Sequence, residues 1–178
     1  MRRQVSILGL ALACAFLAAC SAGRPGEPAP LRNVGLPQQA ASSAISDTPL
    51  GRAVVRAVND YRTAAPLSVN NTLQRAAAVH ASDMAIRNYG GHHNPEGQGP
   101  RDRVLAIDEA YENRIGETIW IGAIPGRQTD AQIAAKVLNS WSNSPRHRSI
   151  VEAARNTRIG VGVAQKGDTY YVVAVFSD

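Results

Sequence analysis

The chain has 178 residues, a net charge of +5 at neutral pH, 19% charged and 44% hydrophobic residues, and two cysteines. This length predicts a single folded domain. The positive charge comes mostly from arginine, since only Lys136 and Lys166 are lysines, and no Lys/Arg run is interleaved with aromatic residues. The composition therefore argues against nucleic-acid binding.

The first twenty residues, MRRQVSILGLALACAFLAAC, contain two arginines, then an apolar run, then Cys20. A charged start followed by an apolar stretch is typical of a secretory signal, and this stretch falls short of the ~20 apolar residues of a membrane-spanning helix. Leu17–Cys20 resembles the bacterial lipoprotein cleavage box, in which the cut falls before a cysteine that carries the lipid. We therefore predict a signal peptide over 1–19 and lipidation of Cys20. An ordinary signal peptide cut nearby is the alternative.

Cleavage there would leave the folded part without a free cysteine, because Cys14 is discarded and Cys20 becomes a thioether. The domain would then have neither a disulfide nor thiolate chemistry, and its core alone would hold it together. Loss of Arg2 and Arg3 lowers the net charge from +5 to +3. The predicted location is outside the cytoplasm, on the membrane through Cys20. In a diderm bacterium it is the periplasmic face of the outer membrane.

The next stretch is rich in proline, alanine and serine. Such a segment buries too little apolar surface to offset the entropy of ordering it. We therefore predict a flexible tether over 20–46, beginning at the lipidated cysteine. The folded domain is predicted over 47–178, and we expect it to be a monomer.

Helix signals dominate the first part of this domain: capping side chains, proline in a first turn, and apolar residues at helical spacing. The helices expected from them run from Asp47 to about Arg62, from Asn71 to Gly90-Gly91, from Pro100 to Asp108, from Thr129 through Trp141, and onward from Ser144-Pro145.

Strand signals lie later in the chain. Arg114–Gly122 has several isoleucines around a glycine, which indicates a short strand. Arg158–Gln165 alternates isoleucine or valine with glycine or alanine, 166–168 is a turn, and Thr169–Ser177 is rich in tyrosine and valine. This pattern predicts a β-hairpin. Helices first and a hairpin last indicate an α+β domain with helices packed on a small sheet.

The loop NYGGHHNPEG, residues 88–97, contains His92 and His93, two of the four histidines in the chain. Neutral imidazole is a common metal ligand and a ready general base. A loop histidine is more often simply solvated. On this stretch alone, the pair is either an exposed polar turn or part of a site built with residues far away in sequence.

Glu117 lies among Ile115, Ile119 and Trp120. A carboxylate buried in such a stretch must be paired, bound to backbone N–H groups, or shifted in pKa. Alternation along a strand would equally let Glu117 face water.

Ser144 is the expected N-cap of a short helix, which places His147 in its first turn. The electropositive helix end disfavours imidazolium and leaves a neutral ring suited to ligation. The alternative is an exposed, polar helix start. His80 lies on the apolar stripe of the second helix and is interpreted as a packed core histidine.

No local catalytic signature joins these residues. The chain has no Gly-x-Ser-x-Gly elbow and no His-Glu-x-x-His. Spacing along the chain cannot show whether His92, Glu117 and His147 meet.

Taken together, six segments resemble the bacterial branch of the CAP superfamily, named for cysteine-rich secretory, antigen 5 and pathogenesis-related 1 proteins, also called the SCP-like extracellular domain. In chain order they are Val58–Arg62, Val79–Met84, His92–Gly97 followed by Arg103, Gly116–Ile119, Trp141–Arg148 and Ile159–Val163. The resemblance covers 47–178. It implies a three-layer α-β-α sandwich with a small, mainly antiparallel sheet and a surface cleft.

The resemblance also implies roles. In many members the cleft carries two histidines and two acidic residues, and some bind a divalent metal there. His92 matches the first histidine, Glu117 one acid and His147 the second histidine, so His92 rather than His93 is expected to face the cleft. The second acidic position falls on Ser144. Two histidines and one carboxylate can hold zinc with a water, but no cofactor is required.

The expected function is that of a bacterial envelope lipoprotein whose CAP domain is a non-catalytic binding module for a lipid or other small ligand. Its cleft residues would be His92, Glu117, Ser144 and His147. One alternative is a metal-dependent hydrolase, with zinc on the two histidines and Glu117 as ligand or general base. The other is a structural envelope protein that binds protein partners.

Overall fold

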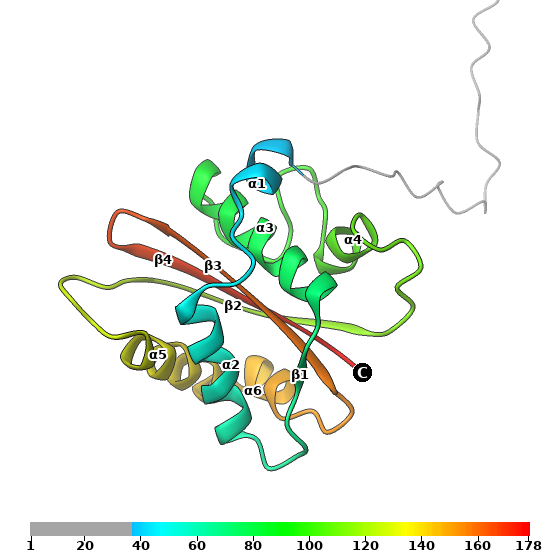
Figure 1. Ribbon diagram of the computed structural model, residues 1–178, viewed down its shortest axis with the longest axis vertical. Helices are drawn as coiled ribbons and strands as arrows, with labels where there is room; N and C mark the ends of the chain where they lie inside the picture. Colours follow the sequence, from blue (N-terminus) through cyan, green and yellow to red (C-terminus); the bar gives the residue numbers. More distant parts are fainter. Residues whose placement is uncertain (1–36) are drawn as a thin grey trace, which may run out of the picture. The chain divides into compact units, whose positions relative to one another are not determined.

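The computed structural model describes residues 37–178, and Figure 1 traces them. The predicted signal peptide, Cys20 and most of the predicted tether lie outside the described residues. Within 37–178, no helix is both long enough and apolar enough to cross a membrane.

A four-stranded sheet forms the middle of the domain. Its strands are β1 (Ser68–Val69), β2 (Ile115–Ala123), β3 (Arg158–Lys166) and β4 (Thr169–Ser177), in the spatial order β1-β3-β4-β2. The pairs β3–β4 and β2–β4 are antiparallel, and the short β1 runs parallel to β3. The predicted hairpin is therefore confirmed as β3 and β4, joined by a turn in which Gly167 has a φ of 58°.

Helices cover both faces of this sheet (Figure 1). On one face lie α3 (Asn71–Arg87), α4 (Pro100–Leu105) and, packed on α3, the short α1 (Gln38–Ser43). On the other lie α2 (Pro49–Tyr61), α5 (Asp130–Asn143) and α6 (Pro145–Val151).

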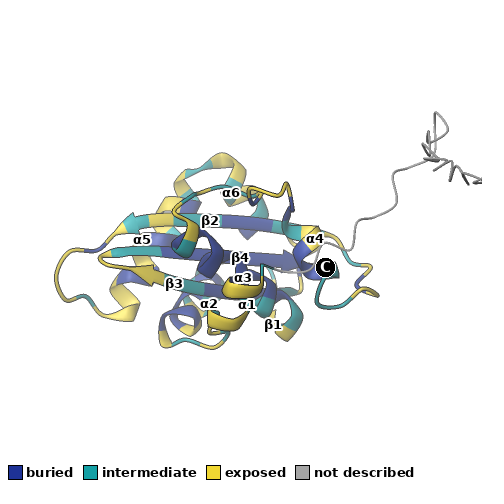
Figure 2. Ribbon diagram, turned by 90° about the horizontal axis from the view of Figure 1, so that it is seen from above, coloured by how far each residue is buried: buried dark blue, intermediate teal, exposed yellow. Residues whose placement is uncertain are grey.

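Alternate residues of β4 divide between the two hydrophobic clusters. Val173 and Val175 pack with α3 and α4, whereas Val172, Ala174 and Phe176 pack with α2, α5 and α6. Figure 2 shows β4 buried along most of its length. The predicted α+β, three-layer α-β-α sandwich is confirmed.

Three helix starts follow from local hydrogen bonds. The side chains of Thr48, Asn70 and Thr129 each accept a bond from the backbone N–H three residues on, which satisfies a donor that the helix itself leaves free. The predicted starts are confirmed at these places. Two predicted helices extend too far. The helix α3 ends at Arg87, followed by its C-cap Asn88 in the left-handed region at φ 57°, and α4 ends at Leu105.

The glycines of β3 let α3 approach the sheet closely. A Cβ at Gly160 would lie 2.0 Å from the backbone nitrogen of Gln74, and one at Gly162 would lie 2.1 Å from that of Ala78. No side chain fits in that space. The alternation of glycine with Ile159, Val161 and Val163 thus has a steric cause that the hairpin pattern did not reveal.

The helix α1 lies in the stretch that the sequence assigned to a flexible tether, so the ordered part begins before Asp47. Ala40 is buried, and the Arg75 guanidinium donates to the carbonyls of Ala41 and Ala44. Composition alone predicted no structure here, because the partner that orders these residues lies about thirty positions later in the sequence.

Candidate functional site

The carboxylate of Glu117 has two partners. Its Oε1 accepts a hydrogen bond from His92 Nδ1 at 2.9 Å, and its Oε2 accepts one from Arg103 Nη2 at 2.7 Å. β2 supplies Glu117, the loop after α3 supplies His92, and α4 supplies Arg103. The sequence left open whether Glu117 is a buried, paired carboxylate or faces water. The structure shows the buried, paired carboxylate.

Arg103 holds more than this carboxylate. Its Nη1 donates to the carbonyl of His92 at 3.1 Å and to the carbonyl of Gln98 at 2.9 Å. The side chain is 1% exposed, so one buried guanidinium ties α4 and β2 to both sides of the histidine loop. Sequence analysis assigned no role to Arg103. The only available signal was that a buried carboxylate needs a cation, and this does not say which arginine provides it.

His80 supports the same loop from α3. Its Nε2 donates to the carbonyl of Gly91 at 2.8 Å, directly before His92. Burial, and then the positive charge of Arg103, lower the pKa of His80 from 6.5 to about 4, so the ring is neutral at pH 7. The predicted core histidine is confirmed, and it also has a structural role at the candidate site.

A charged cluster fixes the beginning and middle of this loop. Arg87 pairs with Asp83 at 2.5 Å and with Glu96 at 2.5 Å, and the hydroxyl of Tyr89 donates to Asp83 at 2.5 Å. Asp83 is buried, so it needs these donors. The loop that carries His92 is held at several points.

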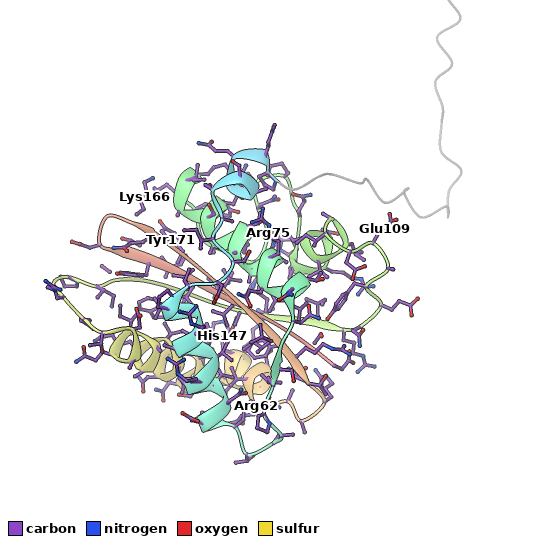
Figure 3. All side chains as sticks on the ribbon, in the orientation of Figure 1. Arg62, Arg75, Glu109, His147, Lys166 and Tyr171 are labelled. Atoms are coloured by element: carbon purple, nitrogen blue, oxygen red, sulfur yellow. The ribbon has the colours of Figure 1, made fainter. Side chains whose placement is uncertain are left out.

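His147 reaches the site from the opposite layer. It is in the first turn of α6, as predicted, and Figure 3 labels it among the side chains. Its ring centroid lies 6.4 Å from that of His92, with the ring planes at 72°. Burial first, then the proximity of His92 and Arg146, lower its pKa. Its Nδ1 is buried and has no hydrogen-bond partner, the kind of atom that a bound water or ligand group satisfies.

The other candidates, His93 and Ser144, are not joined to this group by a hydrogen bond or ring contact within residues 37–178. His93 is exposed, and a Cβ built on Gly99 would lie 3.1 Å from its Nε2, so its ring is next to the start of α4. Ser144 occupies the N-cap position of α6, but its side chain makes no capping hydrogen bond. The structure thus brings together His92, Glu117 and His147, and adds Arg103.

The ionisation of Glu117 decides what this group can do. Burial by itself would raise the pKa of Glu117, but the hydrogen bond from His92 and the charge of Arg103 outweigh it and lower the pKa. An ionised carboxylate only accepts hydrogen bonds. His92 therefore donates from Nδ1, and the Nε2 of a neutral ring keeps its lone pair. Glu117 orients His92, and its side chain is only 1% exposed, so a substrate in solution does not reach its oxygens.

The same contacts bear on the predicted zinc site. Among residues 37–178, no group of three or more His, Cys, Asp or Glu side chains is placed to hold a metal ion. Catalytic zinc sites typically have three protein ligands and a water. Here two imidazoles are close, and the carboxylate that would be third is bound to Arg103. The residues as arranged do not fit a catalytic zinc site.

A groove of about 760 Å³ lies elsewhere, along the outer side of β3. Its walls come from α1, the start of α2, the C-terminal half of α3, the first residue of α5 and the β3–β4 hairpin. None of His92, Glu117, Ser144 and His147 lines it. The histidines are at β2, and β2 is at the opposite edge of the sheet from β1 and β3. The ligand-binding role predicted for these four residues stays a prediction.

Fold and side chains together define a CAP-type domain. Residues 55–176 match the CAP family, the cysteine-rich secretory protein family. The chain belongs to this family.

Similar proteins occur in several bacteria. The chain is 30% identical over 105 residues to uncharacterized protein YkwD of Bacillus subtilis, covering 59% of this chain and 37% of the length of that protein. An extracellular protein containing a SCP domain from Bacillus anthracis has a TM-score of 0.58 at 26% identity, over 72% of this chain and 40% of that one.

An outer surface protein of Borrelia burgdorferi shares the fold over nearly its whole length. Its TM-score is 0.64 at 18% identity, over 76% of this chain and 96% of that chain.

The buried ion pair yields a stability prediction. Replacing Arg103 with leucine should lower the free energy of unfolding by about 3–5 kcal/mol, because Glu117 would remain buried without its cation. Adding Glu117→Gln to that variant should recover part of the loss, since a neutral amide needs no cation. Urea unfolding of the wild type, both single variants and the double variant measures this coupling. Strictly additive losses would show that the pair contributes nothing.

The lowered pKa of His80 yields a pH prediction. The unfolded chain binds the His80 proton near pH 6.5, whereas the folded protein binds it only near pH 4. The contribution of His80 to the free energy of unfolding should therefore be constant above pH 6.5 and fall as the pH decreases from 6.5 toward 4.

His80→Gln is the matched variant, because its amide can still donate to the Gly91 carbonyl but does not titrate. Its pH dependence should be flatter across that window. Parallel curves for the two proteins would mean that His80 does not cause the acid sensitivity.

Proposed function

We propose that this protein is a bacterial envelope lipoprotein whose CAP domain is a binding module for an amphiphilic molecule with a single hydrocarbon chain. The observation that supports it is the 760 Å³ groove. Its volume lies within the roughly 300–1,000 Å³ range of small-molecule sites.

The lining of the groove is suited to an amphiphile. Leu50 and Ala85 are deeply buried and form an apolar floor, and Ile86, Val163 and Tyr170 widen it. This surface favours a hydrocarbon chain, because burying it removes apolar area from water.

Polar side chains lie on the same groove. Lys166 is exposed at the hairpin end of β3 (Figure 3), where it offers a cation to an anionic headgroup. Asp130, an exposed carboxylate at the start of α5, also lines the groove. The proposed ligand therefore places its chain along the floor and its anionic group at Lys166.

The histidine group favours binding over hydrolysis. A hydrolase that used Glu117 as its base would need a free carboxylate oxygen near the substrate. Both oxygens of Glu117 are hydrogen-bonded, and its side chain is 1% exposed. What remains accessible is the imidazole pair, which can accept or donate hydrogen bonds to a bound group.

The envelope location rests on two observations. Arg2, Arg3, the apolar run and Cys20 have the pattern of a lipoprotein signal. The similar structure from Bacillus anthracis is an extracellular protein. A lipid on Cys20 would keep the domain at the membrane, where chains of the proposed ligand class are concentrated.

A pair of isoleucine substitutions tests the groove. Ile86→Glu places a carboxylate in the groove and should weaken binding of dansyl-undecanoate, a fluorescent fatty acid, by about tenfold or more, because an unpaired charge opposes burial of a chain. Ile121→Glu is the control, since Ile121 is 40% exposed on β2 and lies outside the groove. Fluorescence titration gives both affinities. Equal affinities, or no binding by the wild type, would contradict the proposed site.

The anchor has a separate test. Replacing Cys20 with serine should move the protein from the membrane fraction to the soluble fraction, because the thioether can no longer form. Fractionation followed by immunoblotting measures the shift, and Cys14→Ser is the control. Continued membrane association of the Cys20 variant would refute lipid anchoring at this residue.

A further inference from the structure

One wall of the groove is formed by residues 38–46, which we call the strap: α1 and the three residues after it. Five of the strap's residues line the groove: Gln39, Ser42, Ser43, Ala44 and Ile45. The facing walls belong to α3 and the β3–β4 hairpin. The shape of the groove therefore depends on where the strap lies.

The strap has little stability of its own. Its helix has six residues and no side-chain N-cap, far below the length at which isolated helices persist in water. Ala40 is its one buried apolar side chain, while Ile45 is 66% exposed. The helical form of the strap depends on its contacts with α3.

Those contacts are mostly polar and involve three side chains of α3. Arg75 donates to the carbonyls of Ala41 and Ala44, which lie toward the C-terminal end of α1. Such carbonyls lack partners within a helix, and a cation there is favourable. Gln74 donates to the carbonyl of Ser46. Figure 3 shows Arg75 on α3, close to α1.

The third contact joins two hydroxyl groups. The oxygens of Ser43 and Ser82 are 3.1 Å apart, and both residues line the groove. Removing the strap from α3 would break these hydrogen bonds and expose Ala40 together with the surface of α3 that the strap covers. Leu50 and Ala85 belong to the two hydrophobic clusters on the sheet and not to the strap.

We propose that the strap is a gate: it opens away from α3 as a unit, admits one hydrocarbon chain to the groove, and closes over it with Arg75 as the latch. The inference rests on the proposed function, because the gated site is the same groove. The occupant is an amphiphile with an anionic head, which Lys166 can pair with.

A reversible crosslink tests the gating. Ser43→Cys and Ser82→Cys place two thiols where the hydroxyls now meet, and the chain has no cysteine other than Cys14 and Cys20. The pair is introduced into the full chain carrying Cys14→Ser and Cys20→Ser, so that no other thiol can form a disulfide. Oxidation should slow both association and release of dansyl-undecanoate in stopped-flow fluorescence by about tenfold or more, because opening would require breaking a covalent bond. Reduction should restore both rates, and each single cysteine variant is a control.

Hydrogen exchange tests the motion without any ligand. The amides of Ala41 and Ala44 should exchange much faster than those of α3 and β4, since local opening exposes them before global unfolding. Arg75→Ala should speed their exchange by about tenfold or more, the effect of losing hydrogen bonds from a charged donor. It should leave exchange in α3 and β4 unchanged. Arg155→Ala, an exposed arginine after α6, is the matched control.

The outcomes separate the two proposals. If the strap amides exchange as slowly as those of α3, the gate is overturned regardless of the binding kinetics of dansyl-undecanoate. Fast exchange of the strap amides, combined with probe association and release rates that the crosslink does not change, would also overturn the gate. The groove would then remain the ligand site. Fast strap exchange with no probe binding in any variant would overturn the ligand proposal and, with it, the gating. Slowed probe kinetics in the oxidised protein together with fast strap exchange would establish the gate.

Discussion

The buried ion pair between Glu117 and Arg103 is the interaction on which the candidate site depends. Both side chains are 1% exposed, with nitrogen and oxygen 2.7 Å apart, and neither charge could stay buried without the other. The guanidinium also holds the carbonyls of His92 and Gln98, and the carboxylate holds the ring of His92. The bond from Arg103 to the His92 carbonyl fixes the position of His92, and the bond to Glu117 places its proton on Nδ1.

This arrangement also limits the chemistry of the site. A carboxylate whose two oxygens serve a guanidinium and an imidazole orients its neighbours and does not act on a substrate directly. Ser144, the N-cap residue of α6, makes no capping bond with its side chain. What the site presents is a pair of imidazoles that approach from opposite layers, His92 from the loop after α3 and His147 from α6. That pair is suited to recognising a polar group.

The sequence predicted what is decided locally. Thr48 and Thr129 cap helices through bonds three residues away, and the alternation of β3 with its turn specifies a hairpin without help from other parts of the chain. His80 was recognised as a core residue because its position on a helix stripe is a local property. The role of Arg103 and the docking of α1 depend on partners 14 and about 30 residues away. The groove exists only once those elements pack, so no local pattern contained it.

The helix α3 contacts both the histidine loop and the groove. His80 and Asp83 hold the loop, while Arg75 and Ser82 hold the strap. Its backbone packs against Gly160 and Gly162 with no room for a methyl group. We therefore expect no shift of this helix that would couple the histidine loop to the groove. Any coupling would need a part that can move. Among the described residues that line the groove, the strap is held mainly by a few polar contacts, whereas the floor is fixed in the core. Ligand entry and the histidine pair are therefore expected to act independently, with α3 as their common rigid support.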